Sequence, residues 1–69
     1  MTVAGHWIGD VEGTPLELVI RTSPIGAWEV QLREPGGRRV TRWFDQPQQA
    51  RSYAAGLLAT GEWQPTFAL

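Results

Sequence analysis

The chain contains no cysteine, which excludes disulfide bonds and cysteine-based zinc sites as supports for the fold. Its only histidine is His6, so no cluster of metal-ligating side chains is indicated, and we expect no metal and no other cofactor. No apolar run approaches the roughly 20 residues of a membrane-spanning helix, and no basic stretch followed by an apolar run is present near the N-terminus. We therefore expect a soluble, cytoplasmic protein with no membrane partner.

Lysine is also absent, and all six basic residues are arginines. GC-rich codon usage explains this bias without invoking a function. The charges are unevenly spread, because residues 33–51 hold five arginines against two carboxylates, a net +3 in a chain whose total is −1. A protein that binds a polyanion over its whole surface is usually more basic. Nucleic-acid binding would therefore have to use a local basic patch.

Residues suited to catalysis are sparse. The sequence indicates no serine or cysteine nucleophile beside His6. Asp10 and Glu12 flank a turn signal, where carboxylates commonly serve only solubility. Gly36-Gly37 is not followed by a helix, unlike the glycines of a phosphate-binding loop. A chain of 69 residues is also short for a deep pocket, so we predict that the protein is not an enzyme.

Four segments show the alternation of apolar and polar residues that is typical of half-buried strands. They are residues 6–11, 16–22, 27–34 and 38–44. A two-residue turn at Glu12-Gly13 would join the first two and put Trp7, Gly9 and Val11 on the core face, but this register is left open.

Two Pro-x-Gly loops, Pro24-Ile25-Gly26 and Pro35-Gly36-Gly37, join the last three segments. Three-residue loops of this kind favour hairpins and determine which residues face each other. The predicted opposite pairs are Leu18 and Leu32, Ile20 and Val30, Leu32 and Val40, Val30 and Arg42, and Trp28 and Phe44. This register gathers the apolar residues on one face, with Arg42 as the exception.

A helix is predicted over residues 46–60, with Asp45 as its N-cap and Pro47 in its first turn. Its apolar residues recur at helical spacing and should pack on the sheet: Ala50, Tyr53, Ala54, Leu57 and Leu58. Gly61 is a plausible stop. The tail, residues 62–69, is too apolar to be free, so it should fold back on the core or join a partner chain.

These elements predict an α+β fold in one small domain, residues 1–69. The sheet is expected to be a four-stranded antiparallel meander, in the order β-β-β-β-α, with the C-terminal helix packed on one face.

The second face of this sheet is then open, and the register places Arg33, Arg39, Thr41 and Trp43 on it, with Arg38 nearby. Arg33 lies opposite Arg39, and such a like-charge pair invites an anion. Trp43 could stack on bases or anchor a protein interface, or it could lie flat on its own sheet. Further residues could instead form contacts with a protein partner or a second copy of the chain: Ile8, Val19, Trp63 and Phe67.

Residues 27–58 contain Trp28-Glu29-Val30-Gln31-Leu32, Gly36-Gly37-Arg38-Arg39, Arg42-Trp43-Phe44 and, on the helix, Ala50 and Tyr53-Ala54. This half of the chain resembles the three-stranded DNA-binding domains of the plant AP2 and integrase arm-binding kind. The resemblance implies DNA reading by the exposed sheet face, through Arg33, Arg39, Thr41 and Trp43. The chain departs from those families in its negative charge and its extra N-terminal strand. Its topology is also similar to the dimeric PC4-like single-strand binders.

Two functions remain from these observations. The first is a non-enzymatic module that binds a protein partner or itself through the open sheet face and the apolar tail. The second is a nucleic-acid-binding module that uses the arginines and Trp43 of the last hairpin. The near-neutral charge favours the first.

Overall fold

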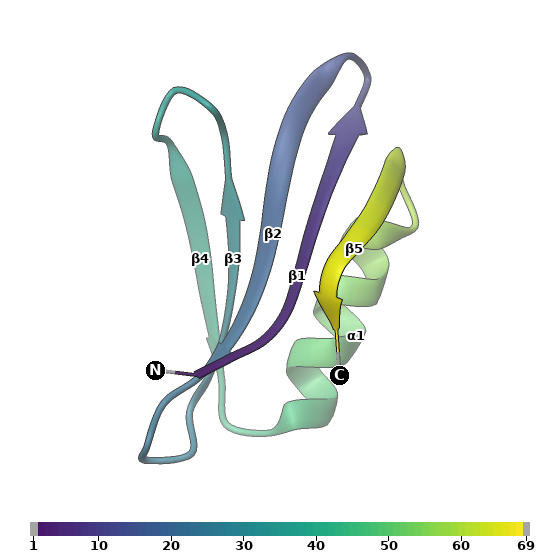
Figure 1. Cartoon of the computed structure of the whole chain (residues 1–69). Helices are drawn as coiled ribbons and strands as arrows, with labels where there is room; N and C mark the ends of the chain where they lie inside the picture. The colour runs from purple at the N-terminus through teal and green to yellow at the C-terminus, as the bar shows by residue number, and fades with distance from the viewer. Residues whose placement is uncertain (1, 69) are drawn as a thin grey trace.

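The computed structural model describes residues 2–68, and the side chains of residues 2–66. It is an α+β structure with one antiparallel sheet and one helix (Figure 1). The elements are β1 (Thr2–Val11), β2 (Thr14–Thr22), β3 (Trp28–Arg33), β4 (Arg39–Phe44), α1 (Pro47–Leu58) and β5 (Glu62–Ala68). The strands lie in the order β4-β3-β2-β1-β5. The sheet therefore has two free edges, one on β4 and one on β5.

Both Pro-x-Gly loops form the predicted three-residue hairpins. Gly26 and Gly37 have φ values of 86° and 91°, a region that glycine enters without a steric penalty. In the second loop the N–H of Glu34 donates to the carbonyl of Arg38 at 2.9 Å. The resulting register has every pair predicted from the sequence: Leu18 and Leu32, Ile20 and Val30, Leu32 and Val40, Val30 and Arg42, and Trp28 and Phe44.

The first hairpin has the two-residue turn that was left open. Glu12 and Gly13 both have positive φ values, 52° and 83°, as a tight hairpin turn of the primed type requires. The Asp10 side chain supports the turn by accepting a hydrogen bond from the N–H of Gly13 at 2.8 Å. Trp7 consequently lies opposite Leu18, on the face that carries the core.

The prediction of four strands is wrong, because residues 62–68 of the tail form a fifth strand beside β1. Strand β1 is also longer than expected, since it begins at Thr2 rather than at residue 6. Trp63 lies opposite Gly9, and a Cβ on Gly9 would come within 2.5 Å of the Trp63 ring. The missing side chain of Gly9 therefore makes room for the indole and lets β5 pair with β1.

Helix α1 lies within the predicted range, but Asp45 is not its N-cap. Gln46 takes that position, with extended backbone angles and no side-chain hydrogen bond to the helix. The reason is Pro47, whose fixed φ suits the first helical position, so that the preceding residue becomes the cap. Gly61, with φ of 79°, allows the chain to turn beside Asp10 into β5, where a Cβ would clash with the main chain.

The core lies between α1 and one face of the sheet. Its buried residues are Leu18, Ile20, Val30, Ala50 and Ala54. Trp7, Trp28 and Trp63 pack around them, which lets a short chain fill a core with few residues. Within residues 2–68, no helix is long and apolar enough to cross a membrane.

Candidate interaction surface

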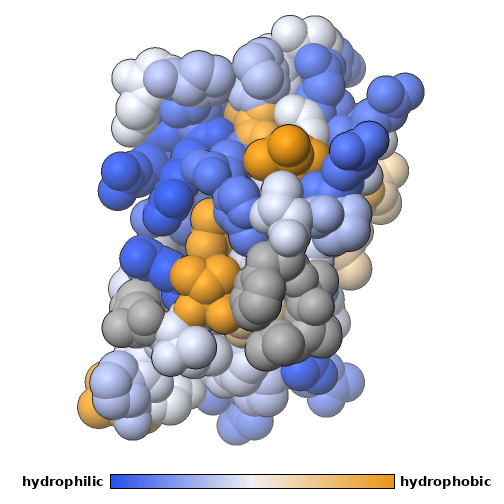
Figure 2. Space-filling view, viewed as in Figure 1, coloured by the Kyte–Doolittle hydropathy of each residue, from blue (hydrophilic) through white to orange (hydrophobic). Residues whose placement is uncertain are grey.

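The sheet face turned away from α1 carries rows of side chains that run across the strands. One row joins Val3, Arg21, Glu29 and Trp43, and the next joins His6, Val19, Gln31 and Thr41. A third row contains Gln64, Ile8, Glu17, Arg33 and Arg39. Figure 2 shows that hydrophilic side chains cover most of this face and that the hydrophobic patches between them are small.

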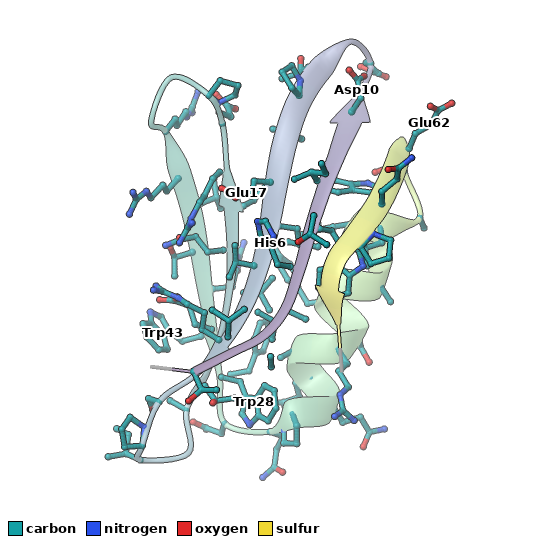
Figure 3. All side chains as sticks on the ribbon, viewed as in Figure 1. His6, Asp10, Glu17, Trp28, Trp43 and Glu62 are labelled. Carbon is teal, nitrogen blue, oxygen red and sulfur yellow. The ribbon has the colours of Figure 1, made fainter. Side chains whose placement is uncertain are left out.

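The centre of this face is a connected set of polar side chains. His6 Nε2 donates to Glu17 at 2.5 Å, and Figure 3 shows these two side chains on the same face. Glu17 also forms an ion pair with Arg33 at 3.5 Å, while Arg33 Nε donates to Gln31. The hydrogen bond from His6 lowers the pKa of the Glu17 carboxyl from its usual 4.5; burial opposes this effect, and the charges of His6 and Arg33 add to it. Glu17 is thus held as a carboxylate.

A second pair of charged side chains, Arg21 and Glu29, lies on the open face at neighbouring positions of β2 and β3. Arg21 Nε donates to Glu29 at 2.5 Å, and only 4% of Glu29 is exposed. Val19 lies between the two polar groups and is 3% exposed, although no helix covers it. Long polar side chains of the sheet itself therefore shield the interior of this face, so it offers little apolar surface to a partner.

The structure separates the residues predicted to bind a partner or nucleic acid. Arg33 is engaged by Glu17 and Gln31, so the Arg33–Arg39 pair already contains its anion and does not require another. Arg38 and Arg39 are exposed and form no ion pair with any residue in the described part of the chain. Thr41 accepts a hydrogen bond from Gln31 at 3.2 Å, and Trp43 is 55% exposed.

The predicted dimer contacts are also dispersed. Ile8 is 49% exposed on the open face, whereas Val19 is buried by its neighbours. Trp63 points to the other face, packs on the core and donates its indole N–H to the carbonyl of Thr60 at 2.7 Å. The side chain of Phe67 lies outside the described residues. The apolar tail is a strand of the sheet, so it does not form a separate binding segment.

Sequence reasoning missed the free edge of β4. The hydrogen bond between Glu34 and Arg38 identifies that pair as a bonded one, and bonded pairs alternate along an antiparallel ladder. Val40 and Arg42 therefore point their backbone groups toward β3, while Arg39, Thr41 and Trp43 point theirs outward. The hairpin register contained this signal, but only the strand order shows that, within residues 2–68, no strand pairs with the outer side of β4.

Side chains on both faces of this edge are accessible. Val40 is 48% exposed on the core face because α1 does not reach over it, and Trp43 is exposed on the open face. Arg42 lies over the Tyr53 ring at 5.8 Å, a cation–π arrangement. We use the name β4 edge for the outward backbone groups of Arg39, Thr41 and Trp43 together with the accessible side chains of strand β4.

Three hollows lie away from the β4 edge. One of about 510 Å³ lies on the open face and is lined by Val3, His6, Val19, Arg21 and Arg33. A groove of about 570 Å³ opens where the β1–β2 and β3–β4 hairpins separate, and its charged lining consists of Asp10, Glu17, Arg33, Glu34 and Glu62. An apolar hollow of about 280 Å³ lies under α1 beside Trp7 and Trp28. The linings of the groove and of the apolar hollow hold no serine, threonine or histidine, whereas the hollow on the open face includes His6, which is hydrogen-bonded to Glu17. Among the described residues no three or more His, Asp or Glu side chains come together in a group that could hold a metal ion.

Comparison with known proteins adds no identity, since no protein family, no curated protein and no solved structure matches this chain. The resemblance of residues 27–58 to AP2-type and arm-binding domains stays a prediction.

Proposed function

We propose that this protein is a cytoplasmic, non-enzymatic interaction module that binds an extended strand of a protein partner along the β4 edge. The observation that carries the proposal is the row of outward backbone groups on Arg39, Thr41 and Trp43. Such a row pairs with an added strand as the strands of the sheet pair with one another.

The other free edge does not offer the same template. Pro65 lies in the middle of β5, opposite Trp7, and the alternation of bonded pairs turns its nitrogen away from β1. Proline has no N–H to donate, so the outer edge of β5 is interrupted. Strand β4 contains no proline and pairs with β3 in an unbroken register from Arg39 to Phe44.

The side chains beside the β4 edge would add selectivity. Trp43 and Val40 supply apolar contacts on opposite faces, and Arg39 and Arg42 add one positive charge to each face. Exposed aromatic and arginine side chains are enriched among residues that dominate binding energy. In the interior of the open face, by contrast, the polar side chains already form hydrogen bonds and ion pairs with one another.

An array of ten-residue peptides with alternating apolar and polar residues tests the proposal, with Thr41→Pro as the perturbation. The Thr41 N–H points away from β3 and pairs with no strand in residues 2–68, so proline removes a donor of the edge and spares the bonds to β3. Leaving one partner group without its hydrogen bond costs about 1–3 kcal/mol, so peptides bound by the wild type should bind roughly 10–100-fold more weakly.

The matched control is Thr41→Ala, which loses the same hydroxyl and the same hydrogen bond from Gln31 but keeps the backbone donor. It should bind peptides like the wild type. Circular dichroism of each variant verifies that the sheet persists. Equal binding by Thr41→Pro and Thr41→Ala, or no peptide bound by the wild type, would count against the β4 edge.

A second function is favoured by one observation: Arg38 and Arg39 are exposed without ion pairs in the described chain, and Trp43 is exposed farther along the same strand. Arginines contact phosphates and aromatic rings stack on bases, so this hairpin could bind nucleic acid. Titration with single- and double-stranded oligonucleotides at about 50 mM salt tests it. Arg39→Ala and Trp43→Ala should weaken binding, whereas Arg51→Ala on α1 should not. A titration without any change would exclude this function.

A further inference from the structure

We infer that the strand bound by the β4 edge is β4 of a second copy of this chain, in one antiparallel register centred on Thr41. The inference rests on the proposed function and names its partner. Thr41 would face Thr41 of the second copy across a two-fold axis. Arg39 would face Trp43, and Val40 would face Arg42. The two sheets would then form one continuous sheet with β4 strands at its centre.

The direction of the backbone groups limits the registers. Only Arg39, Thr41 and Trp43 point their N–H and C=O groups outward, so a bonded pair across the axis must join two of these residues. The registers that satisfy this condition and keep at least three strand residues paired are centred on Val40, Thr41, Arg42 or Trp43.

Charge and the length of the ladder select among these four. A register centred on Trp43 pairs only residues 42–44 of the strand. A register centred on Arg42 puts the two Arg42 side chains directly opposite each other, which is unfavourable. A register centred on Val40 puts Arg38 opposite Arg42 and shortens the ladder to residues 39–41. The register centred on Thr41 opposes no two arginines and pairs residues 39–43.

The same register joins complementary side chains. Arg39 and Trp43 are both exposed on the open face, and directly opposite positions are close enough for a cation–π contact. On the core face the apolar stem of Arg42 would cover Val40, which is 48% exposed in the single chain. Two of the exposed large hydrophobic residues of the molecule would thus be covered at once. Asp45 follows β4 and would bring a carboxylate near Arg39 of the second copy.

The interface is small. A ladder of five residues on each side buries less than the roughly 1,200 Å² at the lower limit of stable interfaces, so we expect a weak dimer with a dissociation constant between micromolar and millimolar. Sedimentation equilibrium of the wild type from about 10 µM to about 1 mM should show a mass that rises from monomer to dimer over this range. Thr41→Pro should stay monomeric. A wild type that is strictly monomeric at about 1 mM overturns the inference.

The absence of cysteine allows the register to be read by single-cysteine variants. In a bonded antiparallel pair the Cα atoms lie about 5.5 Å apart, within the range that a disulfide spans. Under mild oxidation, Thr41→Cys should form disulfide dimers at least about tenfold faster than Ser52→Cys, an exposed control on α1, because association raises the local thiol concentration. Equal rates for these two variants overturn the inference. Faster dimer formation by Arg42→Cys than by Thr41→Cys overturns the register.

Amide hydrogen exchange separates failure of this inference from failure of the proposed function. The N–H groups of Arg39, Thr41 and Trp43 should exchange rapidly in dilute protein and become protected as concentration rises. Those of Val40 and Arg42, bonded to β3, should be protected throughout. If added peptides protect the three outward amides but concentration does not, the β4 edge binds strands and the second copy is not its partner. If neither protects them, both proposals fail.

Discussion

Replacing Gly9 by alanine tests how β5 is held to the sheet, because Gly9 makes room for Trp63. A Cβ at this position would lie 2.5 Å from two ring carbons of Trp63 and 2.6 Å from the main-chain oxygen of Glu62. Real Cβ atoms do not approach so closely, so the indole must move. That movement breaks its hydrogen bond to Thr60 and its packing on the core.

The expected magnitude follows from two opposing terms. Forcing extra volume into a packed contact costs about 1–3 kcal/mol. Alanine restricts the unfolded chain more than glycine does, which offsets about 0.4–1 kcal/mol of that cost. We therefore expect Gly9→Ala to lower the free energy of unfolding by about 1–2 kcal/mol, from the difference of these terms. For a chain of this size this corresponds to a fall in Tm of about 5–15 °C.

Gly56→Ala is the matched control, since it makes the same chemical change inside α1. Apart from its chain neighbours and the backbone of its own helix, no atom lies within 4 Å of a Cβ at Gly56. Alanine favours the helix over glycine by about 0.8–1 kcal/mol, so this variant should be more stable and melt several degrees higher.

Thermal and urea unfolding followed by far-ultraviolet circular dichroism measure both variants. This readout is preferable to fluorescence, because Gly9→Ala changes the surroundings of Trp63 directly. If Gly9→Ala is as stable as the wild type, or if both alanine variants shift stability in the same direction, the close packing of Gly9 and Trp63 is refuted.

Three further substitutions test the core and the open face. Leu18→Ala removes a fully buried side chain and should cost about 2–5 kcal/mol, a large share of the total stability, which urea unfolding would show. Glu29→Ala should cost about 2 kcal/mol by leaving Arg21 without its charged partner; a smaller loss in Arg21→Ala than in the wild-type background would confirm the pairing. The folded state lowers the pKa of Glu17, so its contribution is present above pH 4.5 and is lost as pH falls below that value. Tm between pH 6 and pH 3 should therefore fall less steeply in Glu17→Gln than in the wild type, and parallel curves would refute this.

Local patterns predicted the central part of the fold because the relevant interactions are short in sequence. Each Pro-x-Gly loop sets the register of its own hairpin, and the alternation along β3 then assigns the two faces. For the same reason the positions of Trp43 on the open face and of Arg42 on the core face followed from counting residues between turns. The helix was predicted by its spacing of apolar residues, while its first residue depended on Pro47 rather than on Asp45.

The sequence predicted which residues lie on the open face, but it did not predict the hydrogen bonds and ion pairs that join their side chains. The sequence placed Arg33 opposite Arg39, yet the pair was expected to attract an external anion. The structure adds Glu17 and Gln31 as neighbours of Arg33, and both come from positions that the register alone could have supplied. What the register could not supply is the conformation of these long side chains, which decides that they satisfy one another and bury Val19.

The amino-acid sequence by itself determined the two Pro-x-Gly hairpins and the side of the sheet on which each residue of β2, β3 and β4 lies, because turns and alternation are local properties of the chain. Only the tertiary structure decided that β5 pairs with β1, since that contact joins segments more than fifty residues apart and depends on the fit of Trp63 over Gly9. Strand β5 covers the β1 edge of the β1–β4 meander, and its own outer edge is interrupted by Pro65. The outer edge of β4 is therefore the one that presents an unbroken row of backbone groups. The β4 edge is therefore a consequence of long-range packing, although the residues that line it could be read from the sequence.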